Sequence, residues 1–123
     1  EILLRNDFAS CMVLTDVDEM GRLMCRAKMA VTASGRTIYE LMACKVETVC
    51  ICQNTRQLTH LFVSEINGII NLGYFKDVSE VDFITAVNKK RSADKNTQRK
   101  WLDLSKSKEN VLTEIRNLNK NEI

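Results

Sequence analysis

The chain has 123 residues and a mass of 14.1 kDa, a length that suits one domain with a sizeable core. Its composition, 45% hydrophobic and 28% charged, is that of an ordinary globular protein, which argues against intrinsic disorder. The net charge is only +2, and although residues 89–123 carry 10 basic and 5 acidic side chains, no run of Lys and Arg is dense enough to predict nucleic-acid binding.

The five cysteines are interpreted as reduced residues. Cys50 and Cys52 stand two apart on an expected strand and share one of its faces, and the others, among them Cys25 and Cys44, are expected to be small buried side chains. His60 is the only histidine, so we expect no zinc site, and the spacings suggest no disulfide framework. Reduced thiols favour a cytoplasmic location. No signal peptide and no apolar stretch of about 18 residues is present, so no membrane span is expected.

Short apolar runs alternate with segments of helical period along the chain. Strands are expected over four apolar runs, at 10–15, 29–33, 48–52 and 69–72. Helices are expected over 17–27, 38–44 and 58–66, after Ser79, and in "NTQRKWLDL" and "ENVLTEIRNL".

Capping residues set several of the expected helix ends. Asp16 and Glu19 have capping-box spacing before the first helix, and Asn67-Gly68 ends the helix expected over 58–66. Lys45 follows the helix over 38–44, where glycine is the usual residue. It must therefore adopt the left-handed conformation, or the helix must end in another way.

The alternation of strands and helices predicts βαβ units with right-handed crossovers. We expect a Rossmann-like α/β domain with a parallel sheet of about four strands, helices on both faces and a helical C-terminal tail. Residues 1–88 are assigned to the domain, and residues 89–123 to C-terminal helices that pack on it. Four strands are few for such a domain and no clear first strand is visible, so the chain is expected to be part of a larger α/β protein or a truncated piece.

Three loops follow expected strands and should meet at one edge of the sheet, where parallel α/β sheets bind ligands. These loops are Thr15–Asp18, Ser34–Thr37 and Gln53–Gln57. In the second loop, Ser34 and Gly35 provide a small, permissive backbone at a helix start, where the helix dipole favours a phosphate. Arg36 and Thr37 add a positive charge and a hydroxyl. A tight joint between strand and helix explains the same residues without a ligand.

Glu40 also has two interpretations. Thr37 and Glu40 have the spacing of a capping box, in which the carboxylate accepts a hydrogen bond from the Thr37 backbone N–H. Alternatively, the carboxylate accepts hydrogen bonds from a ribose diol while the helix start holds a diphosphate. From the residues alone, capping is the commoner role.

The stretch "AKMAVTASGRTIYELMACKVETVCICQNTRQLTHLF…NGIINLG" resembles the C-terminal domain of GT-B-type UDP-sugar enzymes. It is most similar to the UDP-sugar hydrolases of pseudaminic and legionaminic acid synthesis, and then to the MurG-like glycosyltransferases. The resemblance covers about residues 12–73. It rests on the order of a "VDEM" helix, a strand, a Gly turn with Thr and Glu, a second strand and a Gln/Asn loop. It departs at Lys45-Val46-Glu47, where the family has a "GVP"-like segment.

The resemblance implies half of a GT-B fold and a UDP-sugar ligand, and with it the ribose role of Glu40 becomes the preferred one. Eight residues are implied to touch the ligand: Val17 beside the uracil, Glu40 at the ribose, Ser34, Gly35, Arg36 and Thr37 around the diphosphate, and Gln53 and Asn54 at the sugar or diphosphate.

The implied function is donor binding in a nucleotide-sugar hydrolase or glycosyltransferase of surface polysaccharide or nonulosonic acid biosynthesis. In the resembled enzymes the catalytic base lies in an N-terminal domain, so this chain alone is expected to be inactive and to need that domain or a second copy. We expect no catalytic residue and no cofactor within it. His60 is placed on the polar side of a helix, pointing away from the ligand.

A function of a different class stays open. The chain would then be a non-catalytic α/β interaction module whose sheet edge and basic C-terminal helices contact another protein. Loss of nucleotide affinity in a Glu40→Ala variant distinguishes the first function from the second.

Overall fold

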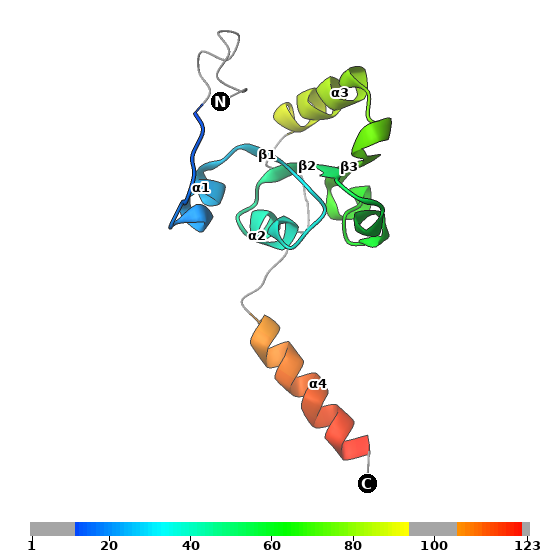
Figure 1. The fold of residues 1–123 in the computed structure, drawn as a ribbon. Coiled ribbons are helices and arrows are strands. Elements are labelled where there is room, and N and C mark those ends of the chain that lie inside the picture. Colours follow the sequence, from blue (N-terminus) through cyan, green and yellow to red (C-terminus); the bar gives the residue numbers. More distant parts are fainter. Residues whose placement is uncertain (1–11, 94–105, 122–123) are drawn as a thin grey trace.

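The computed structural model describes residues 12–93 and 106–121 and shows an α/β fold (Figure 1). Three parallel strands form one sheet in the order β1-β2-β3, so the expected class is confirmed, with three strands in the described residues instead of about four. The elements are α1 (Met20–Arg26), β1 (Met29–Thr32), α2 (Thr37–Ala43), β2 (Glu47–Cys52), η2 (Thr55–Thr59), η3 (Glu65–Asn67), β3 (Ile69–Tyr74), η4 (Phe75–Asp77), α3 (Glu80–Arg91) and α4 (Ser107–Asn121).

The strand expected over 10–15 does not form within the described residues. Residues 12–15 have no regular structure and their side chains are exposed, while residues 10–11 lie outside the described residues. Among the described residues β1 is therefore paired with β2 alone. An apolar run becomes a strand only when a neighbour offers backbone hydrogen bonds, and nothing in the run itself specifies that neighbour.

The helix expected over 17–27 is shorter than its periodicity suggested. α1 begins at Met20, its N-cap is Glu19, and no side chain caps it, so the expected capping box of Asp16 and Glu19 is wrong. Asp16 instead has a positive φ of 51°, a left-handed conformation that Asp tolerates better than most residues. Asp16 thus redirects the chain between the irregular residues 12–15 and the start of α1.

α2 matches its expected position and ends in a Schellman motif. The Lys45 N–H donates to the Met42 carbonyl and the Val46 N–H to the Leu41 carbonyl, both at 3.0 Å. Leu41 and Val46 are buried, which supplies the hydrophobic contact that accompanies this motif. Lys45 has a φ of 59°, so the left-handed conformation is the one of the two expected alternatives that forms.

Replacing Lys45 by glycine is therefore expected to stabilise the protein. Glycine adopts φ near 59° without the steric penalty that a Cβ incurs, so the free energy of unfolding should rise by about 1 kcal/mol. Urea denaturation measures this change. Lys45→Ala is the control, because it removes the charge but keeps the Cβ, and an equal gain in both variants would contradict the backbone explanation.

The helix expected over 58–66 is wrong. Two short 3-10 helices, η2 and η3, occupy this region, and Leu61 and Ile66 are 88% and 96% exposed. Asn54 caps η2, since its side chain accepts a hydrogen bond from the Gln57 N–H at 3.1 Å. Val63 is buried in the core instead, so tertiary packing overrides a short apolar period that fits a helix equally well.

Two layers cover the sheet. α2, η2 and η3 lie on one side and α3 on the other (Figure 1). Between α2 and the sheet is a cluster of buried apolar side chains, and β2, the central strand, is buried along nearly its whole length. The cluster contains Ile38, Met42, Cys50, Val63 and Ile69, with Phe62 packed against it.

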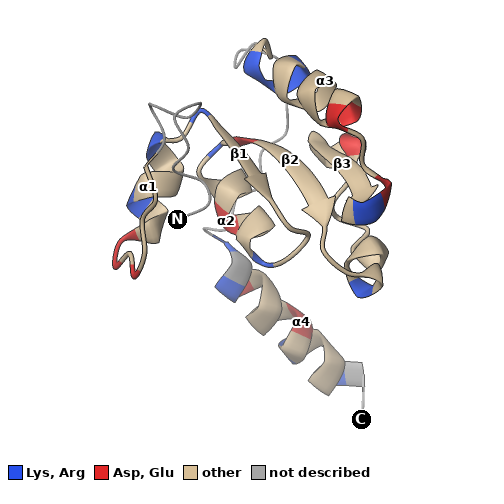
Figure 2. Cartoon of the chain, turned by 45° about the horizontal axis from the view of Figure 1, so that its top comes forward, with Lys and Arg blue, Asp and Glu red and all other residues tan. Residues whose placement is uncertain are grey.

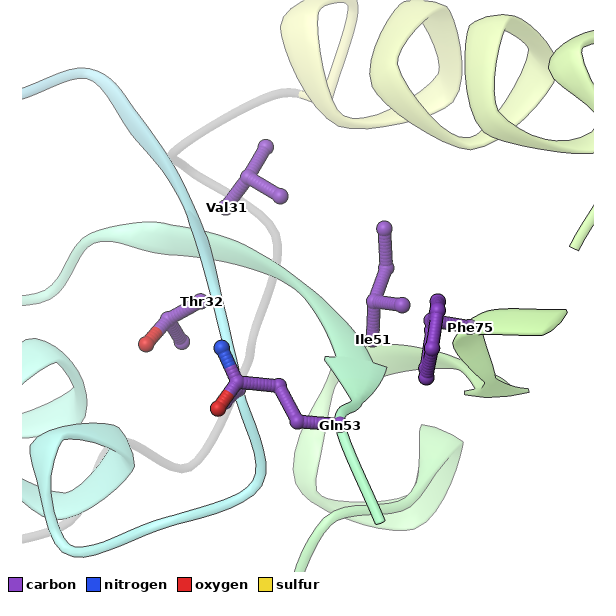
Figure 3. Close-up of a pocket in the computed structure, with 6 residues that line it drawn as sticks. Val31, Thr32, Ile51, Gln53 and Phe75 are labelled. Atoms are coloured by element: carbon purple, nitrogen blue, oxygen red, sulfur yellow. The ribbon is translucent and has the colours of Figure 1, made fainter.

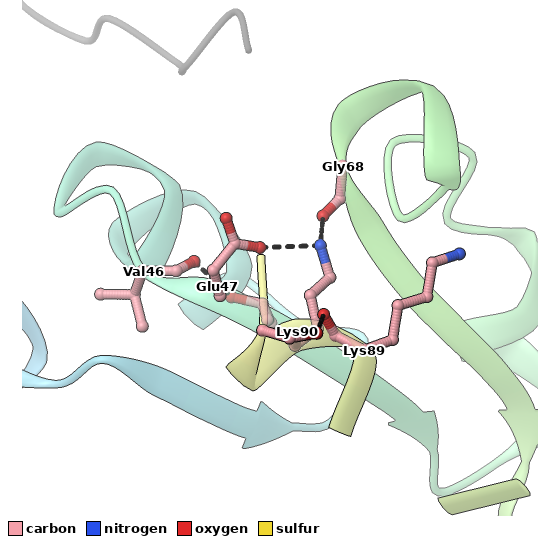
Figure 4. Close-up of polar contacts among 7 residues, drawn as sticks. Val46, Glu47, Gly68, Lys89 and Lys90 are labelled. Atoms are coloured by element: carbon pink, nitrogen blue, oxygen red, sulfur yellow. Dashed lines mark hydrogen bonds and ion pairs between the residues drawn. The ribbon is translucent and has the colours of Figure 1, made fainter. Parts of the chain in front are cut away.

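A buried ion pair joins α3 to the sheet. Lys90 Nζ lies 2.8 Å from the Glu47 carboxylate and also donates to the Gly68 carbonyl (Figure 4). Basic residues gather in the last turn of α3 and acidic residues in its first, an order that the helix dipole favours (Figure 2). Lys90 thus links α3 to β2 and to Gly68, the residue that precedes β3.

Lys90→Met should be strongly destabilising, because it removes the cation beside a carboxylate that is only 5% exposed. Loss of one member of a buried pair typically costs about 3 kcal/mol. Lys89→Met is the matched control: it removes the neighbouring charge from an exposed position of the same helix. Equal melting temperatures for the two variants would show that the ion pair contributes little.

Cys25 and Cys44 form a disulfide, so the expectation that both are reduced, buried side chains is wrong. The bond links α1 to the end of α2 across 19 residues of chain. α1 has no buried residue of its own. Its position therefore depends on this covalent link more than on packing. Cys50 and Cys52 remain free and buried, as expected.

Reduction should release α1 without unfolding the sheet. We expect trypsin to cleave after Arg22 and Arg26 faster in the presence of a dithiol, while the melting temperature of the core changes little. The Cys25→Ser variant should be cleaved quickly without reductant. Cleavage rates in α1 that do not change on reduction would show that packing alone holds this helix.

The C-terminal region is described in part. α4 includes the expected "ENVLTEIRNL" helix, whereas "NTQRKWLDL" lies outside the described residues. The apolar side chains of α4 are exposed, so the assignment of residues 89–123 to helices packed on the domain stays a prediction. None of the helices in the described ranges is long and apolar enough to cross a membrane.

Candidate functional site

A pocket of about 570 Å³ lies at the carboxyl edge of the sheet, where the expected ligand edge was placed. We call it the sheet-edge pocket. Val31 and Ile51 project from β1 and β2 toward the side on which α3 lies, with the Phe75 ring beside Ile51 (Figure 3). The amide of Gln53 lies near Thr32 (Figure 3). The lining residues are Val31, Thr32, Ala33, Ile51, Gln53 and Phe75.

The pocket is apolar on one wall and polar on the other. Val31, Ile51 and Phe75 provide flat hydrophobic surface, and 49% of Phe75 is exposed. Thr32 and Gln53 provide a hydroxyl and an amide. Ligand pockets commonly combine apolar walls with a few polar groups, in volumes of about 300–1,000 Å³. The size and lining of this pocket therefore suit a small organic ligand.

The β1–α2 turn, residues 33–36, borders this pocket through Ala33 and is closed by a hydrogen bond within the turn. The Gly35 N–H donates to the Ala33 carbonyl at 2.9 Å, so this amide is already engaged. Gly35 does not have a positive φ, and a Cβ added to it would meet no atom within 4 Å. Neither the backbone conformation nor the packing of the described residues requires glycine here.

Glu40 does not form the expected capping box. The N-cap of α2 is Arg36, and no side chain caps the helix. Glu40 is exposed in the first turn of α2, and Arg36, in the preceding turn, is exposed as well. Of the two interpretations of Glu40, the capping role is thus wrong, and its carboxylate faces solvent close to the β1–α2 turn.

The loop after β2 brings two of the expected ligand residues to the same edge. Gln53 lines the pocket, and its backbone N–H donates to the Gln57 side chain at 2.7 Å. Asn54 is occupied as the cap of η2. Its side chain therefore serves the loop, and Gln53 is the residue whose amide is offered to a ligand.

Val17 lies apart from this arrangement. It is half-buried in the segment before α1 and is not among the residues that line the pocket. Ser34 to Thr37 are contiguous in the turn and the start of α2, next to Thr32 and Ala33 of the lining. Of the eight expected ligand residues, Gln53 is therefore the one that lines the pocket, whereas the turn adjoins it only through Ala33.

His60 lies between the β1–α2 turn and the loop after β2. The sequence pattern instead predicts it on the polar side of a helix, pointing away from the ligand. Its Nδ1 lies 3.3 Å from Ser34 Oγ and its Nε2 lies 2.9 Å from Tyr39 Oη. Phe62 completes the group, with ring centroids 4.8 Å from Tyr39 and 6.4 Å from His60. We call these four residues the His60 cluster. The sequence pattern does not reveal this cluster, because it predicts one helix over 58–66. In the structure η2 ends at Thr59, and His60 follows it and contacts Ser34 and Tyr39.

A buried thiol adjoins the same cluster. Ser34 hydrogen bonds to Cys50, while burial and the neighbouring Cys52 raise the pKa of the Cys50 thiol to about 11. The Cys50 side chain is fully buried. Cys50 is therefore a protonated core residue at neutral pH and no candidate nucleophile. The described residues contain no group of three or more His, Cys, Asp or Glu side chains that could hold a metal ion.

No family model, curated protein or solved structure matches this chain.

Proposed function

We propose that this chain binds a nucleotide-sugar of the UDP-sugar class at the carboxyl edge of its sheet, as the donor-binding part of a hydrolase or glycosyltransferase of surface polysaccharide or nonulosonic acid biosynthesis. The observation that carries the proposal is the sheet-edge pocket, which opens beside the β1–α2 turn and the Gln53 loop. The ordered resemblance of residues 12–73 to such domains supports the ligand class. The fold alone would suit many other ligands.

The pocket supports this ligand class through its lining. A nucleobase or sugar ring needs flat apolar surface and a few hydrogen-bonding groups, which Phe75 and Gln53 supply. A diphosphate needs positive charge, which Arg36 supplies from an exposed position in the turn. Glu40 is exposed one turn further along α2 and would accept hydrogen bonds from the ribose hydroxyls.

In this function the chain binds the donor, and it does not activate the water or the acceptor that attacks it. The turn and Arg36 would neutralise the charge that grows on the departing diphosphate in either reaction. His60 has both ring nitrogens engaged by Ser34 and Tyr39, so it does not serve as the base. The base would come from a further domain or a second copy of the chain.

Calorimetric titration with UDP, with CMP and AMP as controls, tests the proposal. Gly35→Ala should lower UDP affinity by about tenfold or more, because a Cβ that meets no protein atom would project into the space of a bound diphosphate. Glu40→Ala should lower it to a similar degree, because the ribose loses its acceptor. Thermal unfolding of both variants should stay close to that of the unmodified protein, since neither change removes a packing contact.

Gly21→Ala is the matched control. This glycine is exposed on α1 and is likewise free of neighbours within 4 Å, so the variant should bind UDP as the unmodified chain does. The proposal fails if the folded protein shows no heat with UDP, or if Gly35→Ala and Glu40→Ala bind it normally.

The second candidate is a non-catalytic interaction module, and two observations favour it. β1 has an open edge among the described residues, and α4 exposes a stripe of apolar side chains. Open edges and unpaired apolar stripes are typical of surfaces that contact another chain. Under this function the Glu40→Ala substitution does not change the affinity of the chain for any nucleotide. The stripe contains Val111, Leu112, Ile115 and Leu118.

A further inference from the structure

We propose that His60 is a positioning residue that fixes the β1–α2 turn by holding Ser34 from its buried side. The inference rests on the proposed function in one respect only, namely that this turn faces a ligand. The holding itself is a property of the free protein and is tested without one.

Ser34 is only 5% exposed, so its hydroxyl points into the protein and not toward the sheet-edge pocket. There it meets His60 Nδ1 at 3.3 Å and shares a hydrogen bond with the thiol of Cys50 in β2. The side chain that the sequence assigned to the diphosphate is thus an anchor, and what the turn offers a ligand is its outer surface.

His60 is itself held by its neighbours. Its Nε2 is engaged by Tyr39 Oη at 2.9 Å, and the Tyr39 ring packs on Phe62, which contacts the core. Hydroxyl groups both donate and accept, so either tautomer of the imidazole satisfies both contacts. The ring is therefore held at both nitrogens by side chains that are themselves fixed.

The contact between Ser34 and His60 joins two loops. Ser34 belongs to the loop after β1, and His60 follows η2 in the connection after β2, which also includes Gln53. These two loops border the sheet-edge pocket, with Ala33 on one wall and Gln53 on the other. His60 links the loops at 26 residues of separation, so it sets the shape of the pocket without touching its occupant.

Hydrogen exchange of the ligand-free protein tests the holding. His60→Ala should speed exchange of the Gly35 and Ile38 amides, which bond within the turn, by about tenfold. The Phe83 amide of α3 should be unaffected. Leu61→Ala is the matched control, because this neighbouring side chain is 88% exposed and should change none of these rates.

Two conservative variants separate positioning from general packing. Asparagine places an amide near the position of Nδ1, so His60→Asn should keep the Ser34 contact and restore exchange to within about twofold of the original rate. Glutamine reaches toward Tyr39 instead, so His60→Gln should exchange as fast as His60→Ala. Equal rates in all three variants would overturn the proposal.

The pathway through Ser34 is tested by a double-mutant cycle. Ser34→Ala should speed turn exchange as His60→Ala does, and the double variant should add little, because both remove the same contact. If the increases in exchange rate of the two single variants multiplied in the double variant, the proposal would be overturned. UDP affinity should follow the same pattern. If the unmodified protein binds no UDP, the proposed function fails, while the exchange rates still decide the role of His60.

Discussion

The structure depends on the burial of β2 between two layers. This strand has neighbours on both edges and is covered by α2 on one face and by α3 on the other. Because a parallel strand buried on both faces has no contact with water, each of its polar groups needs an internal partner. Glu47 finds Lys90, and Thr48 donates to the Val46 carbonyl at 2.9 Å. The Glu47–Lys90 contact fixes the position of α3 against the sheet.

The same burial creates the candidate site. When β2 ends at Cys52, the chain must leave the core, and it does so at the edge where β1 also ends. The two exits form the walls of the sheet-edge pocket, and the His60 cluster closes the space beneath the turn. Binding residues and core residues thus come from the same short segments. Ser34 illustrates this, since it belongs to the turn but directs its hydroxyl into the core.

Some elements were predictable because local pattern and tertiary role agree. β1, β2, α2 and the cap of α3 by Ser79 follow from apolar runs and capping residues, and the left-handed Lys45 is one of the two helix ends that the sequence allowed. The helix predicted over 58–66 does not form, because the same apolar residues also fit two short 3-10 helices with Val63 buried in the segment between them. A periodic pattern states which residues are apolar but not which of them meets the core.

By itself the sequence determined the α/β class, the parallel direction of the strands and the edge shared by the loops after β1 and β2, because strand and helix periods and the handedness of crossovers are local properties. Only the tertiary structure decided that Cys25 and Cys44 are joined, that Glu40 does not cap α2, and that His60 lies against Ser34 and Tyr39. Each of these depends on residues distant in the chain or on the position at which a helix begins. Spacing along a sequence does not encode such contacts, because the turn between two segments sets their relative direction.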